Sequence, residues 1–301
     1  MLYPLLFVPV YKDYIWGGDR IARCFHRKEI SGKVAESWEI SCHKDGMSVV
    51  ENGPLKGKSL EELFETEREA LMGKERGRGQ FPLLLKVIDA QDNLSVQVHP
   101  HKGNEAKSEC WVILDVEKDS VVYAGLKNHY PKEEILEKLP SKEILSLMRT
   151  ISVKKGEMIS IPGGRLHAIG SGNLIFEIQQ TSNTTYRVYD WGRGRNLHLE
   201  EAKEVLLYDD TEDPRISPKL IEETPYYSQM ELIRTPLFVV EKWTLNGVQK
   251  WQKKENQCEF LFCIEGENSL VPVGRSCLIP ASCEPITIET EKCMFIRTFV
   301  P

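Results

Sequence analysis

A histidine that follows a tight turn is the residue of this chain most clearly placed for chemistry. Residues 156–166 predict a strand and a Pro-Gly-Gly turn, after which a second strand presents His167. Strands joined by such a turn hold an imidazole in one direction, and a catalytic metal site needs ligands that are held in this way. We therefore predict that His167 binds a metal ion.

A second set of polar residues alternates along a predicted strand upstream. Because successive side chains of a strand point to opposite faces, Ser95, Gln97 and His99 share one face and the apolar residues between them share the other. We expect the apolar face to pack against a neighbouring layer and the polar face to line an interior. Glu109 lies on the next predicted strand, where its carboxylate can meet these polar groups and His167 at one ion. Imidazole and carboxylate ligands with an open position suit a catalytic Zn²⁺.

The spacing around His167 resembles the second sequence motif of the cupin superfamily. In that motif a Gly is followed after five residues by Pro-x-Gly and after two more by His, which matches Gly156, Pro162, Gly164 and His167. Asn normally closes the motif, and Ser171 stands in its place.

Two sets of metal ligands compete upstream of this motif. The generic first cupin motif, His-x-His followed by Glu, selects His99, His101 and Glu105. The alternative keeps the first histidine and adds Gln97 and Glu109. Pro100 cannot donate a hydrogen bond to a neighbouring strand and is expected at a strand end, which puts His101 in a loop. We therefore favour the alternative set.

Six segments resemble type I mannose-6-phosphate isomerases, and they occur in the order found in that family. They are residues 16–18, 36–39, 81–87, 95–100, 109–111 and 184–191. The resemblance is to the short bacterial and archaeal form and runs from about residue 4 to the C-terminus. It implies one Zn²⁺ per chain held by His99, Glu109 and His167, with Gln97 as a fourth ligand. It also implies that Arg187 is the active-site arginine.

The activity implied by this resemblance is the zinc-dependent interconversion of D-mannose 6-phosphate and D-fructose 6-phosphate through an enediol. Alternatives are a cupin-type glucose-6-phosphate isomerase, a sugar-binding regulator without turnover, and a non-haem iron dioxygenase, because two His and one carboxylate also suit Fe(II). Two segments depart from the family: the loop between His99 and Glu109 is shorter than in many relatives, and residues 192–195 are compact. Both shape the rim of the pocket.

Two lysines are further candidates for the pocket, by position and by the resemblance. Lys86 lies within an apolar strand, where it can supply a cation or, with a lowered pKa, a general base. Lys107 lies two residues before Glu109 and therefore on the same strand face. We assign both lysines to catalysis.

Arg187 is the third catalytic candidate, because a planar guanidinium suits phosphate or enediolate oxygens. Alternation places Thr185, Arg187 and Tyr189 on one strand face. A purely structural role would instead pair Arg187 with a surface carboxylate such as Asp190. We assign Ser95 and Glu177 to substrate binding and expect Trp111 to be a core or pocket-wall aromatic.

Composition argues against several classes of function. The chain has 301 residues and a net charge of −6, which argues against nucleic acid as the main partner. Its first ten residues are apolar but hold two prolines and no basic start, so we predict an edge strand and not a signal peptide. No apolar stretch approaches a membrane span in length. We expect a cytoplasmic enzyme, with its eight cysteines mostly free thiols and a small sugar phosphate as its ligand.

The predicted fold is mainly β: two cupin-type (jelly-roll) β-barrel halves with a few inserted helices. Helices are expected over residues 60–72, on each side of Pro140 and over 199–207, and an acidic, proline-containing connector over 208–225. The Gly and Pro spacing of residues 156–162 recurs at 274–280, which indicates two related halves.

The second half contains no metal-site pattern, because no histidine follows His198. We predict a metal-binding catalytic domain over residues 1–225, including the helical insertions and the connector. A metal-free cupin-like domain is predicted over residues 226–301. Its role would be structural, covering the first barrel or forming the interface of a homodimer.

Overall fold

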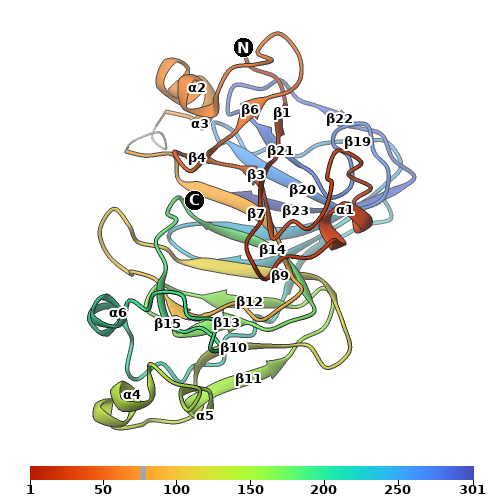
Figure 1. Cartoon of the computed structure of the whole chain (residues 1–301). Coiled ribbons are helices and arrows are strands. Elements are labelled where there is room, and N and C mark those ends of the chain that lie inside the picture. The colour runs from red at the N-terminus through yellow and green to blue at the C-terminus, as the bar shows by residue number, and fades with distance from the viewer. Residues whose placement is uncertain (75–78) are drawn as a thin grey trace. The chain divides into compact units, whose positions relative to one another are not determined.

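The computed structural model describes residues 1–74 and 79–301, and strands dominate this part of the chain (Figure 1). Most of the strands join three sheets of eight, six and five strands, and the few helices are short. The prediction of a mainly β chain with a few inserted helices is confirmed.

The chain forms two compact units, each assembled from separate stretches. Unit 1 comprises residues 1–10, 38–84 and 217–301, and unit 2 comprises residues 11–37 and 85–216. The N-terminal strand and residues 38–84 therefore belong with the C-terminal part of the chain. The division into a catalytic and a metal-free domain at residue 225 stays a prediction.

Two sheets build unit 2, and three strands of the first sheet begin or end in unit 1. The first sheet has the order β12 (Met158–Ile161), β9 (Glu109–Val116), β14 (Asn173–Gln180), β7 (Leu83–Ala90), β3 (Glu36–Ile40), β2 (Val10–Lys12). The second has the order β11 (Met148–Ser152), β10 (Val121–Leu126), β13 (His167–Ile169), β8 (Val96–Val98), β15 (Tyr186–Tyr189). Strand β9 pairs antiparallel with β12 and β14, and β8 pairs antiparallel with β13 and β15.

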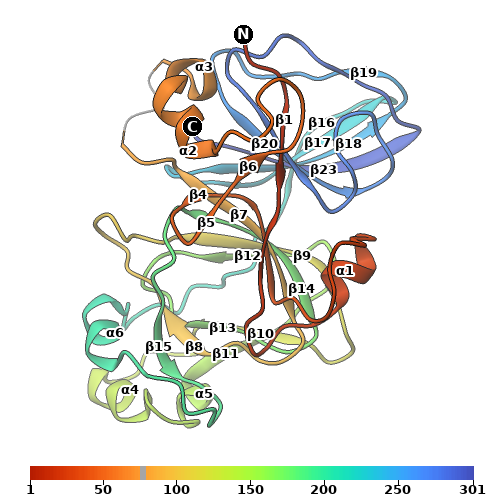
Figure 2. The ribbon, with the colours of Figure 1, turned by 45° about the horizontal axis from the view of Figure 1, so that its top comes forward.

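The second sheet of unit 2 separates an interior from an outer helical layer. Inside, Trp111 and Ile159 of the first sheet pack in one apolar cluster with Val122 of the second. Outside, Val96 and Val98 pack in another cluster with residues of α4 (Lys132–Lys138), α5 (Ile144–Leu147) and α6 (Leu199–Val205). These helices gather around β15 and β8 (Figure 2). The predicted division is confirmed for Val96 and Val98 on the outer face and for Ser95 and Gln97 on the inner face. Leu94 packs in the inner cluster instead, so placing it outside was wrong; it precedes β8, and the alternation of the strand does not extend to it.

The predicted helices form with small differences in their bounds. Besides α4, α5 and α6, the chain has α1 (Arg20–Cys24), α2 (Leu60–Thr66) and α3 (Arg68–Met72). The Ser59 side chain accepts a hydrogen bond from the Glu62 N–H, as a capping box requires. The single helix expected over residues 60–72 is two helices, because Glu67 leaves the helical conformation with ψ of 28°.

One strand prediction was wrong, and the predicted connector contains a strand that was not expected. The first strand, β1 (Leu5–Val8), is not an edge strand: Leu5 and Leu6 pair with β21 (Ser276–Ile279), while Phe7 and Val8 pair with β6 (Val49–Val50). The connector contains β16 (Lys219–Glu223), which pairs with β17 (Tyr227–Arg234). All residues of β16 are exposed, and the charged composition that indicated a connector is also typical of protected edge strands.

Unit 1 is built on the eight-stranded sheet, in the order β16-β17-β18-β23-β20-β21-β1-β6. Its remaining strands are β18 (Val239–Asn246), β23 (Lys292–Phe299) and β20 (Glu259–Glu265). Two small pairs join β19 (Gln249–Lys250) to β22 (Thr287–Ile288) and β4 (Cys42–His43) to β5 (Gly46–Met47). Trp243, Leu261 and Phe295 lie in its apolar core.

The internal repeat seen in the sequence extends to strand register. In unit 2, Glu109 of β9 pairs with Ile161, the residue before Pro162. In unit 1, Glu259 of β20 pairs with Ile279, the residue before Pro280. The same carboxylate position is therefore retained in both halves of the chain.

Unit 1 neutralises its buried acids with an arginine. The Arg297 side chain is 2% exposed; its NH1 lies 3.3 Å from Glu241 Oε2, and its NH2 donates to Glu259. The indole N–H groups of Trp243 and Trp251 donate to the same two carboxylates, each at 2.8 Å. The second half thus contains a self-sufficient ion cluster where the first half contains histidines.

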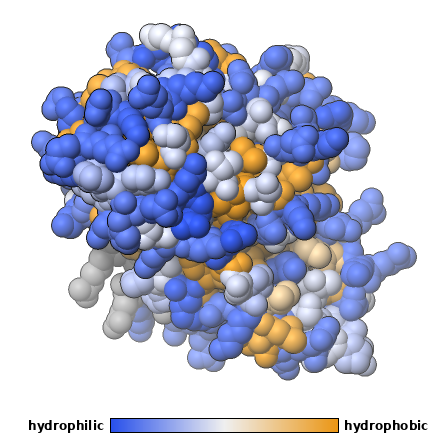
Figure 3. Space-filling view, turned by 90° about the horizontal axis from the view of Figure 1, so that it is seen from below, coloured by the Kyte–Doolittle hydropathy of each residue, from blue (hydrophilic) through white to orange (hydrophobic). Residues whose placement is uncertain are grey.

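Hydrophilic residues cover most of the molecular face seen in Figure 3, and hydrophobic residues show in smaller areas between them. No helix of the described residues combines the length and the apolar character that a membrane crossing demands. The eight cysteines are free thiols, and six of them are buried.

Removing Arg297 should destabilise the protein strongly, because two buried carboxylates would lose their cation. We expect Arg297→Met to lower the free energy of unfolding by about 3–5 kcal/mol, as for other broken buried ion pairs. Urea unfolding followed by tryptophan fluorescence measures this change. Lys138→Met, which breaks the partly exposed pair with Glu134, is the control and should change the free energy of unfolding far less, because solvent screens such a pair. A loss for Arg297→Met no larger than for the control would contradict the role of the cluster.

Candidate metal centre and adjoining cavity

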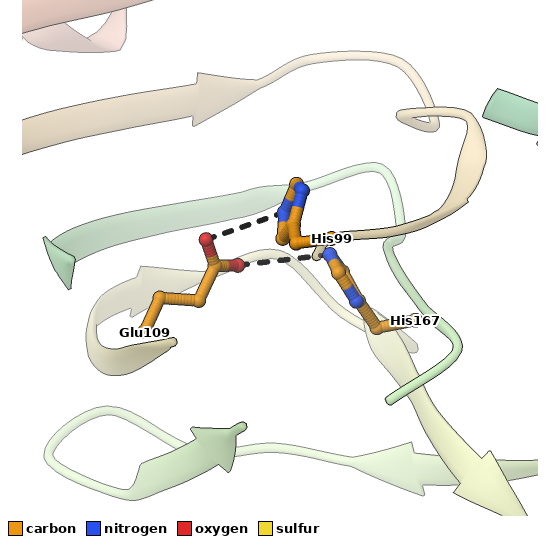
Figure 4. A group of neighbouring side chains, drawn as sticks. All are labelled: His99, Glu109 and His167. Carbon is orange, nitrogen blue, oxygen red and sulfur yellow. Dashed lines mark ion pairs between the residues drawn. The ribbon is translucent and has the colours of Figure 1, made fainter. Parts of the chain in front are cut away.

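Three buried side chains of unit 2 converge on one point. His99 follows β8, Glu109 opens β9 and His167 opens β13, and their ligand atoms all lie within 4.8 Å of one another. The Nε2 atoms of His99 and His167 lie 3.4 and 3.6 Å from the two oxygens of Glu109 (Figure 4). Two imidazoles and a carboxylate in this arrangement match the three-ligand pattern of catalytic metal sites.

Backbone carbonyls fix the direction of both imidazoles. His99 Nδ1 lies 2.9 Å from the Thr184 carbonyl oxygen, and His167 Nδ1 lies 2.8 Å from that of Arg165. Because a carbonyl only accepts, each Nδ1 carries the hydrogen and each Nε2 keeps its lone pair. Such carbonyl partners are the usual support for metal-binding histidines.

Burial keeps both histidines neutral. Burial and the nearby Lys107 ammonium lower the pKa of His99 to about 3. Burial also lowers the pKa of His167. The Glu109 carboxyl differs: burial raises its pKa, but the charge of the Lys107 ammonium outweighs burial and holds the pKa well below its usual range. The cluster therefore offers two neutral imidazoles and one carboxylate, the protonation states in which these groups bind metal.

A tight turn holds His167 close to His99. The Gly164 N–H donates to the His99 carbonyl oxygen at 2.8 Å, and Gly164 has φ of +88°. A Cβ at Gly163 would meet the Pro100 carbonyl oxygen at 2.6 Å, and one at Gly164 would meet Leu207 at 2.7 Å. The two glycines are needed because the turn approaches neighbouring backbone and side chains too closely for any other residue.

A lysine already contacts the candidate ligand atoms. Lys107 Nζ lies 3.0 Å from His99 Nε2 and 2.7 Å from Glu109 Oε2. Since these atoms attract a cation, the donor set fits a divalent metal ion in charge and in chemistry. His99 and Glu109 would hold such an ion through the same atoms that now contact Lys107.

Gln97 lies next to the three converging side chains, and the competing ligands lie elsewhere. Its Nε2 is 3.3 Å from His167 Nε2, and Ser95 Oγ donates to its Oε1 at 3.2 Å. His101 Nδ1 instead donates to the Val205 carbonyl oxygen at 3.2 Å. The Glu105 carboxylate accepts hydrogen bonds from Thr184 and Ser182. The structure thus brings the favoured set together and separates the generic one, although metal binding itself stays a prediction.

Beyond the cluster, Lys86 and Glu177 extend a buried network of charge. Lys86 Nζ lies 3.0 Å from Glu177 Oε1 and 3.4 Å from Glu36 Oε2. Burial alone would lower the Lys86 pKa, but Glu177 and Glu36 raise it above its usual value. A raised pKa makes Lys86 a permanent cation and argues against the role of general base that the sequence left open. Burial and the Glu109 charge raise the pKa of Glu177.

Trp111 joins the two carboxylates. Its indole N–H lies 3.0 Å from Glu109 Oε1 and 2.9 Å from Glu177 Oε2. One donor shared between two buried acids holds both in place. Trp111 was expected to be a core or pocket-wall aromatic, and its hydrogen bonds to the two carboxylates were not predicted.

A cavity of about 250 Å³ adjoins the network within unit 2. The predicted residues Lys86, Ser95, Gln97, Lys107, Glu177 and Arg187 all line it. Its other lining residues are Tyr14, Trp16, Glu36, Ile88, Leu94, Ile169, Asn183, Thr185 and Arg195. The cavity has the size of a small-ligand site and is polar around its buried end.

Arg187 reaches this cavity from β15. It is opposite Gln97 in register, its NH1 donates to the Asn196 carbonyl oxygen at 2.9 Å, and its Nε is buried without a partner. Asp190 pairs with Arg193 and Arg195 instead, so the structural pairing of Arg187 with Asp190 does not occur. Burial, followed by the charge of Arg195, lowers the pKa of Arg187.

The expected alternation along β15 ends at Arg187. The register shifts between Arg187 and Tyr189, and Tyr189 packs against the outer apolar cluster. Placing Tyr189 on the face of Arg187 was therefore wrong, because a bulge rotates the strand.

Several contributors were not found from the sequence. Glu36 lies in a recognised motif but received no role, and the carbonyls of Thr184 and Arg165 leave no mark on residue type. Arg195 lines the cavity, but residues 192–195 were expected only to shape the rim of the pocket. The sequence offered one signal for Glu36: a charged residue inside a strand that is otherwise buried usually has a partner or a function.

A pair of antiparallel sheets that encloses a His-Glu-His cluster, with a related half in which an arginine replaces the histidines beside the matching glutamate, defines a cupin-type protein with a candidate metal centre. Comparison with known proteins narrows this class. Two family models match: the catalytic domain of type I phosphomannose isomerase over residues 5–136, and the cupin domain of mannose-6-phosphate isomerase over residues 229–300.

Individual relatives agree with the family models. Mannose-6-phosphate isomerase ManA of Bacillus subtilis is 38% identical over 288 residues, which are 89% of this chain and 87% of the relative. The mannose-6-phosphate isomerase of Streptococcus mutans is 36% identical over 272 residues, 84% of this chain and 82% of the relative. A crystal structure of the mannose 6-phosphate isomerase from Bacillus subtilis matches with a TM-score of 0.89 at 31% identity, over 99% of each chain. The chain belongs to the type I phosphomannose isomerase family.

Each of the three converging side chains should be needed for metal binding. We expect His99→Ala, Glu109→Ala and His167→Ala to lose most bound metal, because three ligands are the minimum of a catalytic site. Metal content of the purified variants, measured by mass spectrometry, tests this, with circular dichroism to verify folding. His101→Ala is the matched control and should retain metal. Full metal content in folded His167→Ala would show that the assignment is wrong.

Proposed function

We propose that the chain is a zinc-dependent aldose–ketose isomerase that interconverts D-mannose 6-phosphate and D-fructose 6-phosphate through an enediol. The observation that carries the proposal is the cluster of His99, Glu109 and His167 beside a cavity lined by lysine and arginine. The relatives named for this activity share the family and most of the chain length. Gln97 adjoins the cluster and is proposed as the fourth ligand.

The reaction moves a proton between C1 and C2 of the sugar. A Zn²⁺ held by His99, Glu109 and His167 would supply Lewis acidity toward the carbonyl and hydroxyl oxygens. Lys86 is a buried cation that Glu36 and Glu177 hold in place. Its charge would stabilise the negative charge that develops on the substrate. Lys107 adds a second ammonium beside the ligands.

The other proposed residues bind and orient the substrate. Ser95 and Glu177 line the cavity with hydroxyl and carboxylate groups that suit sugar hydroxyls. Arg187 offers a guanidinium whose Nε is buried and unpartnered, so a substrate oxygen would satisfy it. Lys86, Lys107 and Glu177 are buried at this end of the cavity, and burial strengthens electrostatic interactions with a substrate.

We further propose a cytoplasmic enzyme that acts on a small sugar phosphate and uses neither nucleic acid nor membrane as a partner. Residues 1–225 carry every proposed site residue, and residues 226–301 would form a metal-free cupin-like domain with a structural role. That role includes the interface of a homodimer, which light scattering of the purified protein measures directly.

A coupled assay tests the proposed activity. The purified protein should convert mannose 6-phosphate to fructose 6-phosphate, lose at least about nine-tenths of its activity with a chelator, and recover it with Zn²⁺. Glucose 6-phosphate serves as the competing substrate, and an oxygen electrode should record no uptake. Preferred turnover of glucose 6-phosphate, unchanged turnover after complete metal removal, or oxygen consumption would each contradict the proposal.

Loss of Arg187 should affect catalysis more than stability. If its guanidinium holds oxygens that gain charge in the transition state, Arg187→Ala should lower kcat by roughly 10²–10³. Arg187→Lys keeps the charge but loses the planar fork and should restore little. Both variants should keep their zinc and their melting temperature. Near-normal kcat together with a lowered melting temperature would assign Arg187 a structural role.

A further inference from the structure

Three arginines and one carboxylate lie close together in the chain at the partly exposed end of the cavity, and two of the arginines bind the carboxylate. The buried Asp190 carboxylate accepts hydrogen bonds from Arg193 NH2 at 2.8 Å and from Arg195 NH2 at 2.6 Å and Nε at 2.8 Å. Arg187, three residues before Asp190 in the chain, adds a third guanidinium, whose side chain donates to the Asn196 carbonyl oxygen and not to Asp190. Positive charge is therefore in excess at this end.

At the buried end of the cavity, positive and negative charges are paired. Lys86 lies within ion-pair distance of Glu36 and Glu177, and Lys107 lies within that distance of Glu109. Each lysine therefore has a carboxylate partner, whereas Arg193 and Arg195 share one acid between them. An anionic group of a ligand would be stabilised most where this positive charge is uncompensated.

Of the two arginines bound to Asp190, only Arg195 lines the cavity. Arg195 uses Nε and NH2 for Asp190, which leaves NH1 without a hydrogen bond among the described residues. A guanidinium held on one edge by a carboxylate keeps its other edge available for the oxygens of a phosphate. Its side chain is 29% exposed, so an anion can reach it without crossing the core.

The backbone presents Arg195 in a defined position. Trp191, Gly192 and Gly194 have φ of 55°, 78° and 76°, so the segment is tightly turned. The Trp191 indole N–H donates to the Leu94 carbonyl oxygen at 2.6 Å, which ties the start of the segment to the residues before β8. Binding an anion there requires little further ordering.

We propose that Arg195, oriented by Asp190, binds the phosphate group of the substrate. This inference rests on the proposed function, which puts a hexose 6-phosphate in the cavity. The phosphate lies at the opposite end of the sugar from C1 and C2. With the reacting carbons beside His99 and Glu109, the phosphate therefore extends toward the partly exposed end, where the uncompensated arginines are.

The paired substitutions Arg195→Ala and Arg193→Ala test the proposal, because both remove one hydrogen-bonded partner of Asp190 and only one lines the cavity. For mannose 6-phosphate we expect Arg195→Ala to raise KM roughly 10–100-fold, the range for a lost charged hydrogen bond, and to lower kcat by much less. Arg193→Ala should change KM by less than about threefold. Inorganic phosphate should inhibit the wild type and Arg193→Ala competitively and inhibit Arg195→Ala far more weakly.

Equal changes in KM for the two variants would overturn the proposal and assign Arg195 to loop structure. An unchanged KM with a lowered kcat would overturn it as well. If the wild type fails to turn over mannose 6-phosphate, the proposed function is wrong, and calorimetric titration with inorganic phosphate then decides the inference alone. Phosphate binding that is lost in Arg195→Ala and retained in Arg193→Ala would support it, and equal binding by both would overturn it.

Discussion

The need to compensate a buried carboxylate governs both halves of this chain. Glu109 and Glu259 occupy the same register position, each paired with the isoleucine before a proline, and both are almost completely buried. An isolated charge in such a place costs far more than a domain can supply, so each acid must have a cation. In unit 1 the cation is Arg297, and the cluster is complete within the protein. In unit 2 the surrounding groups are two neutral histidines and Lys107, an arrangement that has room for an exchangeable cation. One scaffold position thus holds a complete ion cluster in one half and a candidate metal centre in the other.

The rest of unit 2 holds these charged groups in place. The turn at Gly163 and Gly164 brings His167 against His99, and carbonyls of Thr184 and Arg165 set the tautomer of both rings. Trp111 ties Glu109 to Glu177, and Glu177 in turn holds Lys86. Each interaction restricts a side chain that would otherwise rotate, and fully satisfied buried networks are rigid. The centre is preorganised because strands and their turns, not flexible loops, carry its groups.

Sequence reasoning reached the fold class, the helices and the membership of the cluster because these depend on local patterns. Alternation along residues 95–98 and the Pro-Gly-Gly turn each act over a few residues, and the structure keeps both. It failed where partners come from far along the chain. The pairing of β1 on both sides and the assembly of unit 1 from three stretches involve residues tens to hundreds of positions apart. The strand inside the connector pairs with the neighbouring β17 and was missed for another reason: its charged residues are also typical of edge strands. The bulge after Arg187 also escaped, since alternation assumes an unbroken ladder.

The chemical role of a side chain could be predicted from the sequence only where its residue type is unusual for its surroundings. His99 and Lys86 are conspicuous among apolar residues. The Thr184 carbonyl oxygen orients His99 as a side chain could, but a backbone group cannot be recognised from residue type. Arg195 shows the intermediate case. Its residue type marks a cation in a glycine-containing segment, but only the geometry separates it from Arg193, which shares the same acid and does not reach the cavity. Two neighbouring arginines with one partner can therefore differ in function because the turn directs only one of them inward.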